Sequence, residues 1–384
     1  MLQFWSAILK PKPLYVYGID GIRVYKSKEH DMKIVLLQDT HTLEHRCKTK
    51  EAISAADFVE RLIENSAPFM VDLYLETHYK FEPGWKIRKP ANFMDVLEDN
   101  LEDCFEFEKI GCKYSNLRAH YVDYRSILED PFVSGRTFNR AYFDFTTRIL
   151  AIKRGAVMRE DIEFLQTAVA KPELRRVFKS GKTLRSFMMR VLKETKFLKQ
   201  VGNIKDRKIR NLIHSLMDKW LNEGVHWAQE LRLDRIEGRL KKLRPVDEYY
   251  NRLRKREITR EQYLESIKPI KQHNESIIYR LYWVNAIIRG ILLDLYLIAR
   301  LFRSYEPRLK KIRGTWVRPK YYEKAHNVIV YAGSAHTRRV EELLRELDFK
   351  LVHWADEDFA KTKIRFHGSG PNCVDIQQNK TETD

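Results

Sequence analysis

The stretch Asn327–Leu344 reads NVIVYAGSAHTRRVEELL and decides the fold class. Its apolar first half predicts a buried strand, and its charged second half predicts a helix. His336 stands at the junction, behind Gly333 and two small residues. In α/β proteins, side chains at the carboxyl ends of parallel strands face a crevice that commonly holds reactive groups. His336 is therefore a candidate functional residue, and its role depends on which side chains lie next to it.

The first part of the chain alternates strand and helix signals in a βαβ rhythm. LYVYGIDGIRVYK suggests a hairpin around Asp20 and Gly21, KIVLLQDTH is an apolar strand, AADFVERLIEN is helical, and PFMVDLYLE returns to strand. YVDYR and, near the C-terminus, FKLVHW add further strands. These patterns predict an α/β fold with a mostly parallel sheet flanked by helices.

A long helical region separates the two halves of this core. We place the N-terminal half of the core at 1–126, an all-helical insertion at 127–315 and the C-terminal half at 316–366. The insertion has apolar residues recurring at three and four, with charged faces between them and no fixed repeat. The polar tail 367–384 is expected to be disordered.

Composition limits the partners and the cellular compartment that the sequence predicts. The 384 residues carry a formal net charge of +18, which makes a polyanion such as nucleic acid a plausible partner. The four cysteines, which form no CxxC pair, are Cys47, Cys104, Cys112 and Cys373. Their spacing predicts reduced thiols in a cytosol-like compartment. It also predicts that they do not form a zinc site. No signal peptide is recognised, so secretion is not expected. Leu281–Phe302 is long and apolar but contains three charges, and we interpret it as a buried core helix and not a membrane span.

Polar residues fall near the carboxyl ends of four predicted strands. They are Asp39 and His41, Glu76, Asp123 and Arg125, and His336. Because strand side chains alternate, Asp39 shares a face with His41, and Asp123 with Arg125. Singly, each is also explained as a helix cap or an ion-pair partner. As a set they favour a functional site, provided that the strands are parallel neighbours.

Two kinds of chemistry fit this set. His41, Glu76 and His336 are suitable ligands for a divalent ion (Mn, Zn or Co), which would activate a bound water. Without a metal, Glu76 or Asp39 would orient an imidazole that acts as general base on water. In either case Arg125 would hold a substrate anion or stabilise charge developing on oxygen.

QDTH at 38–41 and GSAH at 333–336 resemble the two histidine motifs of the TIKI/TraB, ChaN-like and erythromycin-esterase-like superfamily. That superfamily has an early strand-end GxxH or GExH motif, an acidic residue at the next strand and a second GxxH near the C-terminus. Gly333 and His336 match the second motif, whereas Gln38 replaces the usual glycine of the first.

The order LLQDTHT, VDLYLE, YVDYR and VIVYAGSAH is also similar to uncharacterised proteins of large nucleocytoplasmic DNA viruses that infect protists. The resemblance covers about a third of the chain and omits the insertion. It implies an α/β fold with His41, Glu76 and His336 at the site and with Asp39 and Arg125 as companions. It also implies a place in the host cytoplasm or the virion. Its branches include metal-dependent proteolysis, metal-independent ester hydrolysis and haem or iron binding, so the reaction stays open.

Two further motifs are weaker. HTLEH at 41–45 matches the H-x-x-E-H pattern of inverted zinc peptidases, but it begins at a strand end, where His45 would not share a helical face with His41. SGKT at 180–183 lacks the first glycine and the preceding strand of a phosphate loop, and we interpret it as the start of a helix.

Two hypotheses follow. The first is a metal-assisted hydrolase of peptide or ester bonds, with Asp39, Glu76 and Arg125 in catalytic roles and His41, Glu76 and His336 as metal ligands. The alternative is a non-catalytic nucleic-acid-binding or virion core protein that keeps a degenerate site. Its phosphate contacts would come from the densest basic stretch, in particular Lys179, Lys182, Arg185, Arg190, Lys205, Arg207, Lys208 and Arg210. The other reading of that stretch is a solvated helical face.

Overall fold

The fold is described from a computed structural model of the chain. The residues described are 15–39, 52–78, 90, 92–105, 112–123, 163, 181–194, 197–230, 246–303, 310–312, 315–317, 326–356 and 373–375. The chain divides into two compact units. Unit 1 comprises Met1–Tyr124, Lys199–Ile213 and Tyr296–Asp384, and unit 2 comprises Arg125–Leu198 and His214–Leu295.

A six-stranded sheet forms the centre of unit 1, with the strand order β10-β2-β3-β9-β5-β6. The pairs β3·β9, β9·β5 and β5·β6 are parallel, whereas β2 is antiparallel to both of its neighbours. Five strands therefore point the same way and β2 alone is reversed, which confirms the predicted mostly parallel sheet. The strands are β2 (Ile19–Ser27), β3 (Met32–Asp39), β5 (Val71–His78), β6 (Leu117–Asp123), β9 (Asn327–Gly333) and β10 (Lys350–Asp356).

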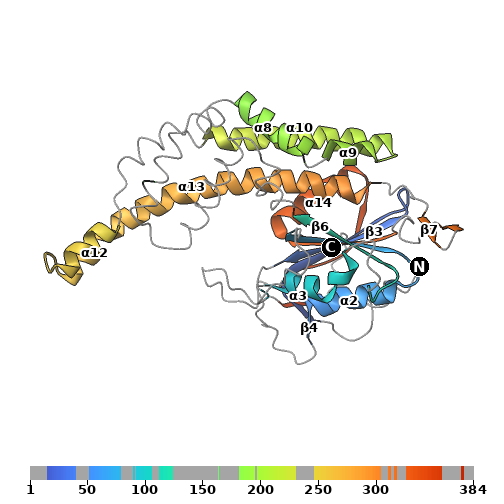
Figure 1. The fold of residues 1–384 in the computed structure, drawn as a ribbon, viewed down its shortest axis with the longest axis horizontal. Coiled ribbons are helices and arrows are strands. Elements are labelled where there is room, and N and C mark those ends of the chain that lie inside the picture. The colour runs from blue at the N-terminus through green and yellow to red at the C-terminus, as the bar shows by residue number, and fades with distance from the viewer. Residues whose placement is uncertain are drawn as a thin grey trace. The chain divides into compact units, whose positions relative to one another are not determined.

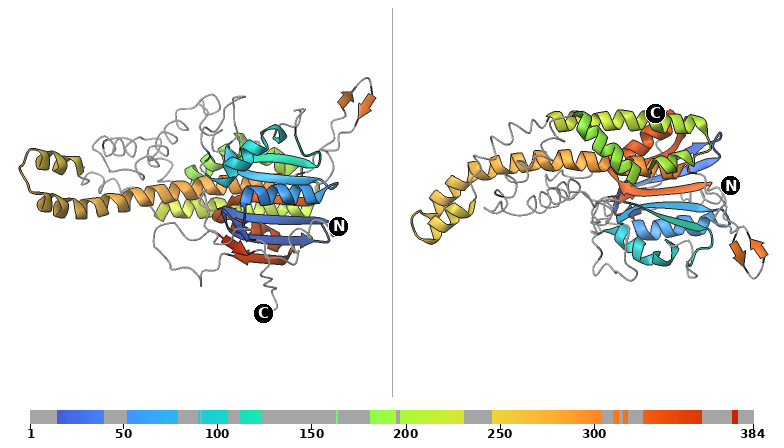
Figure 2. Two further views of the ribbon diagram at one scale, coloured as in Figure 1. Left: turned by 90° about the horizontal axis from the view of Figure 1, so that it is seen from below. Right: turned by 45° about the horizontal axis from the view of Figure 1, so that its top comes forward.

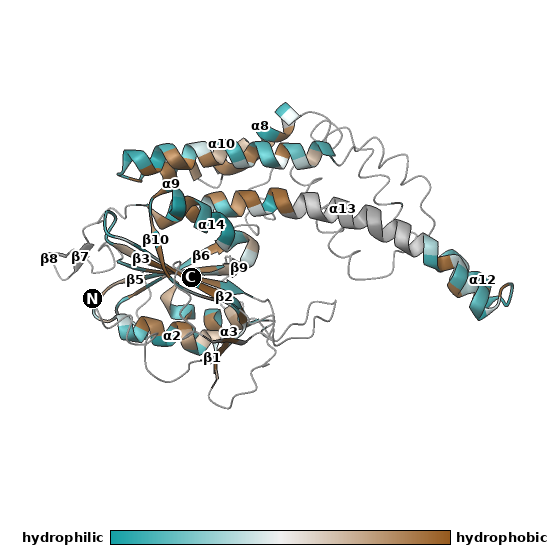
Figure 3. Ribbon diagram, turned by 180° about the vertical axis from the view of Figure 1, so that it is seen from behind, coloured by the Kyte–Doolittle hydropathy of each residue, from teal (hydrophilic) through white to brown (hydrophobic). Residues whose placement is uncertain are grey.

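The central strands are buried because the sheet is covered on both faces. Every residue of β3 and of β9 is buried, which explains their unbroken apolar character in the sequence. On one face, α2 (Ala55–Ser66) and α3 (Phe93–Asn100) pack on side chains such as Leu37, Leu75 and Ile329. The helix α14 (Ser334–Glu346) packs on β9 and β3 from the opposite face (Figure 1). Hydrophobic and hydrophilic residues alternate along α2 and α14, as expected for helices with one buried side (Figure 3).

A small second sheet corrects one expectation. It has the order β11-β1-β4, with β1 (Tyr15–Tyr17), β4 (Ile53–Ser54) and β11 (Cys373–Asp375). The tail was expected to be disordered, yet β11 pairs antiparallel with β1. The remainder of the tail lies outside the described residues.

The predicted hairpin at Asp20 and Gly21 was wrong, because both residues lie within β2, where the register with β3 shifts between Ile19 and Gly21. The chain bends instead at Gly18, whose φ of +92° suits glycine. Gly21 is needed for close approach, since a Cβ there would lie 2.6 Å from Asp356 Oδ1 and 2.9 Å from Gln38 Oε1. The hairpin turn lies after Ser27, between β2 and β3.

The helical insertion follows β6. Its described helices are α8 (Gly181–Glu194), α9 (Phe197–Gly202), α10 (Arg207–Glu230), α12 (Val246–Arg254) and α13 (Arg260–Leu301), and the short strands β7 (Lys310–Ile312) and β8 (Thr315–Val317) come next. Gly181, Lys182 and Thr183 lie in α8, and Ser180 lies outside the described residues, so the predicted helix start at SGKT stays a prediction. The insertion does not form a separate unit along its whole length, because residues 199–213 and the end of α13 belong to unit 1.

Within unit 2, α8, α10 and α13 share a hydrophobic core. Gly224 of α10 packs closely, because a Cβ there would lie 3.1 Å from Met188 and 3.2 Å from Ile291. Trp220 and Leu221 of α10 are also fully buried. The segment Leu281–Phe302 falls largely on α13, which Figure 2 shows as one continuous helix. Among the helices described, none has the length and apolar content required to span a bilayer.

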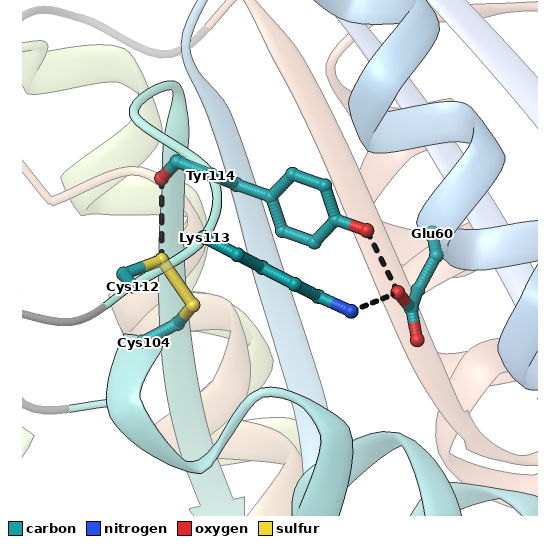
Figure 4. Close-up of a disulfide and its surroundings, with 5 residues drawn as sticks. All are labelled: Glu60, Cys104, Cys112, Lys113 and Tyr114. Atoms are coloured by element: carbon teal, nitrogen blue, oxygen red, sulfur yellow. Dashed lines mark hydrogen bonds and ion pairs between the residues drawn. A yellow bond between two sulfur atoms is a disulfide. The ribbon is translucent and has the colours of Figure 1, made fainter.

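Cys104 and Cys112 form a disulfide, so the prediction of reduced thiols was wrong for this pair (Figure 4). Cys104 ends the 3₁₀ turn η1 (Glu102–Cys104), and Cys112 lies five residues before β6. Their Cα atoms lie 4.6 Å apart. On the same segment Lys113 and Tyr114 both contact the Glu60 carboxylate of α2. The disulfide and these contacts together fix the entry to β6 against η1 and α2.

Candidate functional site

The carboxyl ends of β3, β9, β5 and β6 meet at one edge of the sheet. Asp39 is the register partner of Gly333, and His78 is the partner of Asp123. The sequence predicted a shared site only if these four strands were parallel neighbours, and they are. The predicted site residues that are described at this edge are Asp39, Glu76, Asp123 and His336.

Glu76 and His336 are in direct contact. Nε2 of His336 lies 3.2 Å from Oε1 of Glu76, and the backbone N–H of Gly333 donates to Oε2 at 2.8 Å. Each carboxylate oxygen thus has a separate partner, so the side chain of Glu76 is held in one orientation. A carboxylate can only accept, so Nε2 carries the proton in this contact and Nδ1 is the basic nitrogen of the neutral ring.

The sequence around Gly333 explains how the imidazole reaches the carboxylate. β9 ends at Gly333 and α14 begins at Ser334, so no loop separates strand from helix. His336 lies in the first turn of the helix, directly above the sheet edge. Its side chain is 13% exposed, whereas that of Glu76 is only 4% exposed. The imidazole is therefore the part of the pair that a solute reaches.

The N-terminus of α14 adds hydrogen-bond donors at the same place. Gly333 occupies the N-cap position and provides no side-chain cap. Its own N–H is used by Glu76, but the N–H groups of the following first turn point out of the helix end without an intrahelical acceptor. The helix dipole also favours negative charge there. A negatively charged oxygen beside His336 would be stabilised by both effects.

Asp39 is buried at the edge but belongs to the other face of the sheet. By alternation it shares the face of Val35 and Leu37, which pack toward α2 and α3. Burial, with a smaller contribution from the Asp39 carboxylate, raises the pKa of Tyr331 well above its usual range. The Tyr331 hydroxyl also donates to the Gly18 carbonyl at 3.2 Å. Asp39 thus interacts with Tyr331, on the face opposite to α14 and His336.

The remaining predicted site residues are divided by what the structure describes. Asp123 is buried at the end of β6. His41, Arg125, His45 and Lys179 lie outside the described residues, so their predicted roles stay predictions. Within the described part of the chain, no three His, Cys, Asp or Glu side chains are grouped closely enough to bind a metal ion. A His41, Glu76 and His336 site would require the undescribed His41.

Sequence reasoning missed a buried charged cluster in the amino-terminal halves of β5 and β6, away from the carboxyl ends that carry Glu76 and Asp123. The guanidinium of Arg118 donates to both oxygens of Asp72, at 2.5 and 2.7 Å. His120 Nε2 lies 3.0 Å from Asp72 Oδ1, and Arg300 of α13 approaches His120 Nδ1 at 2.9 Å. Because arginine can only donate, Nδ1 accepts and Nε2 carries the proton, so His120 is neutral.

The pKa values in this cluster follow from burial and from these contacts. Burial lowers the pKa of His120 to about 4, against the raising effect of Asp72. For Asp72, burial alone would raise the pKa, but His120 and Arg118 more than offset it and the pKa is lowered. The strand register creates the cluster, because it pairs Asp72 with Arg118 and Tyr74 with His120, and no motif in the sequence indicates this pairing.

The basic residues of the alternative hypothesis differ in their surroundings. Lys182 and Arg190 of α8 are exposed, whereas Arg185 donates to Asn222 and contacts Asp218. Lys205, Arg207 and Lys208 are exposed before and at the start of α10. Arg210 instead donates to the carbonyl oxygens of Ile204 and Lys205. Arg185 and Arg210 therefore have structural roles.

Comparison of the chain with protein-family models, curated proteins and solved structures finds no match.

Proposed function

We propose that the protein is a hydrolase in which His336 acts as the general base and Glu76 orients it. The observation that carries the proposal is the 3.2 Å contact between His336 Nε2 and Glu76 Oε1, at the carboxyl edge of a parallel sheet. An imidazole whose second nitrogen is held by a fixed carboxylate is the usual arrangement for activating water or another nucleophile. The resemblance of GSAH to the second histidine motif of the TIKI/TraB and erythromycin-esterase-like superfamily supports the same reaction class.

In the proposed reaction, Nδ1 of His336 accepts a proton from water as the water oxygen attacks a carbonyl carbon. Glu76 stabilises the imidazolium that forms. The substrate oxygen becomes negative and is bound by first-turn N–H groups of α14. When the bond to the leaving group breaks, His336 returns the proton to that group. Arg125, which follows β6, is the proposed contact for a negatively charged part of the substrate.

The second form of this proposal is a metal-assisted mechanism that uses a divalent ion. Glu76 and His336 supply two adjacent donors, and His41 is the proposed third ligand. Such an ion, when bound, would lower the pKa of a coordinated water. Glu76 would then serve as a ligand as well as an orienting group.

The test is a hydrolysis screen of the full-length protein against nitrophenyl esters, fluorogenic peptides and phosphoesters, with and without added Mn²⁺, Zn²⁺ or Co²⁺. We expect turnover of at least one class, reduced by about 10² to 10⁴ in His336→Gln, because that is the usual contribution of a general base. His214→Gln is the matched control, since His214 is an exposed histidine of α10 in unit 2. Equal activity of His336→Gln and the natural protein would refute the proposal.

Elemental analysis of the purified protein separates the two forms. Stoichiometric Mn, Zn or Co that is lost in both His41→Ala and His336→Ala supports the metal-assisted form. Turnover by a protein that retains full activity after exhaustive chelation supports the metal-independent form.

A further inference from the structure

The segment 199–213 carries an excess of positive charge. It includes most of α9, the turn between α9 and α10 and the start of α10, and it is called the turn below. Among the fifteen residues 199–213, five are Lys or Arg and one is Asp. All of them belong to unit 1. Four of the cations are exposed and are called the turn cations below: Lys199, Lys205, Arg207 and Lys208.

The backbone of this turn is rigidly built. Asn203 N–H donates to Lys199 O and Ile204 N–H donates to Val201 O, which closes the end of α9. The Asp206 carboxylate accepts from the N–H groups of Lys208 and Ile209 and so caps the start of α10.

Four apolar side chains of the same segment are buried at intervals along it. Val201, Ile204, Ile209 and Ile213 are all nearly inaccessible to solvent. The turn cations occupy positions between these buried side chains and therefore project from a fixed scaffold.

The turn cations are not neutralised within the described structure. None of the four has a side-chain ion pair or hydrogen bond with another described residue, in contrast to Arg185 and Arg210. The one carboxylate in the segment, Asp206, is committed to capping backbone N–H groups. Arg207 and Lys208 also lie in the first turn of a 24-residue helix, where positive side chains oppose the helix dipole. Folding alone would favour acidic residues at these two positions.

We infer that the turn cations form a surface that binds the sugar-phosphate backbone of nucleic acid without sequence preference. Closely spaced phosphates would neutralise the four side chains. No aromatic side chain occurs in residues 199–213, so base stacking is not part of the inferred contact. This surface is separate from His336 and does not depend on the proposed hydrolase.

Nucleic acid fits this surface better than a lipid bilayer. A membrane-binding face combines cations with several exposed apolar side chains that enter the lipid. The isoleucines of the turn are buried, and among the described residues from 197 to 213 Leu198 is the only exposed large hydrophobic side chain. One leucine gives little insertion, so charge is the main attraction that the surface offers.

The test is fluorescence anisotropy of the full-length protein with labelled single-stranded and double-stranded oligonucleotides of mixed sequence, over a range of salt. The variant replaces all four turn cations with glutamine. The matched control replaces four exposed cations elsewhere with glutamine, Lys28, Arg61, Lys268 and Lys350, and so lowers the net charge equally. We expect the turn variant to bind at least tenfold more weakly and to lose about 3 to 4 units of the slope of log K against log salt.

Three other outcomes would overturn the inference. They are equal weakening by the control variant, which would indicate bulk charge alone; no loss in the turn variant; and binding to vesicles of phosphatidylserine but not to oligonucleotides. The milder variant Lys205→Gln/Lys208→Gln guards against misfolding and should lose about half of the slope change.

Discussion

The imidazole of His336 lies 3.2 Å from the carboxylate of Glu76, although the two residues come from opposite ends of the chain. The contact exists because β9 is inserted next to β5, which brings the start of α14 above the end of β5. The geometry makes Glu76 the orienting partner of the imidazole and leads to the first prediction.

Glu76→Gln should remove both the charge beside His336 and the acceptor for its Nε2 proton, because the amide nitrogen then faces the imidazole. The amide oxygen of glutamine can still accept from Gly333 N–H, so the fold should persist. The stabilising charge beside His336 is lost, and we expect hydrolysis to fall by about 10² or more. The measurement is the kcat of a substrate identified in the screen, together with a thermal unfolding curve. Unchanged kcat in a folded variant would mean that Glu76 has no part in the reaction.

Stability should decrease as the pH falls from about 6.5 to about 4 because of His120. Its folded pKa lies below the ordinary value of 6.5, so the unfolded chain binds the extra proton first. The contribution is complete above pH 6.5 and amounts to about 3 kcal/mol lost by pH 4, since one pKa unit corresponds to about 1.4 kcal/mol. Urea unfolding at several pH values measures it. In His120→Gln this part of the pH dependence should vanish, and an unchanged profile would contradict the assignment.

Removing one partner of the buried Asp72 and Arg118 pair should be strongly destabilising. Arg118→Met leaves the Asp72 carboxylate in an apolar site, and we expect a loss of about 3 to 5 kcal/mol. Adding Asp72→Leu should recover part of that loss, because no uncompensated charge then remains. A double-mutant cycle by chemical denaturation tests this coupling. Purely additive effects would show that the two side chains act independently.

The Cys104–Cys112 disulfide should stabilise the entry to β6. Closing a loop of this length removes unfolded-state entropy worth about 2 to 3 kcal/mol. Cys104→Ser/Cys112→Ser should lose that amount in denaturation experiments, and reduction should lower the Tm of the natural protein but not of the variant. Mass spectrometry of the alkylated protein with and without reductant shows whether the bond is present. Full alkylation of both thiols without reductant would contradict it.

Much of the sheet was predictable because its strands are buried on both faces. The apolar runs that end at Asp39, Glu76, Asp123 and Gly333 all became parallel neighbours, and the pairing of Glu76 with His336 followed from their positions at strand ends. His41 and Arg125, which complete the predicted set, lie outside the described residues.

Other features could not be predicted because they depend on contacts between distant segments. Gly21 resembles a turn residue, yet its role is set by Gln38 and Asp356 on neighbouring strands. Asp72 and Arg118 resemble solvent-exposed strand residues until the register places them side by side. The disulfide has no sequence signature, since a separation of eight residues matches neither a CxxC motif nor a dense cysteine framework.

The central position of β9 has a consequence for biosynthesis. β3 and β5 do not pair with each other, and both pair with β9, which the ribosome produces only after the whole helical insertion. Until then two apolar strand edges remain open, and pairing across such a long separation is slow. Nascent chains should therefore depend on chaperones late in synthesis, and any premature stop before Asn327 should yield an insoluble product.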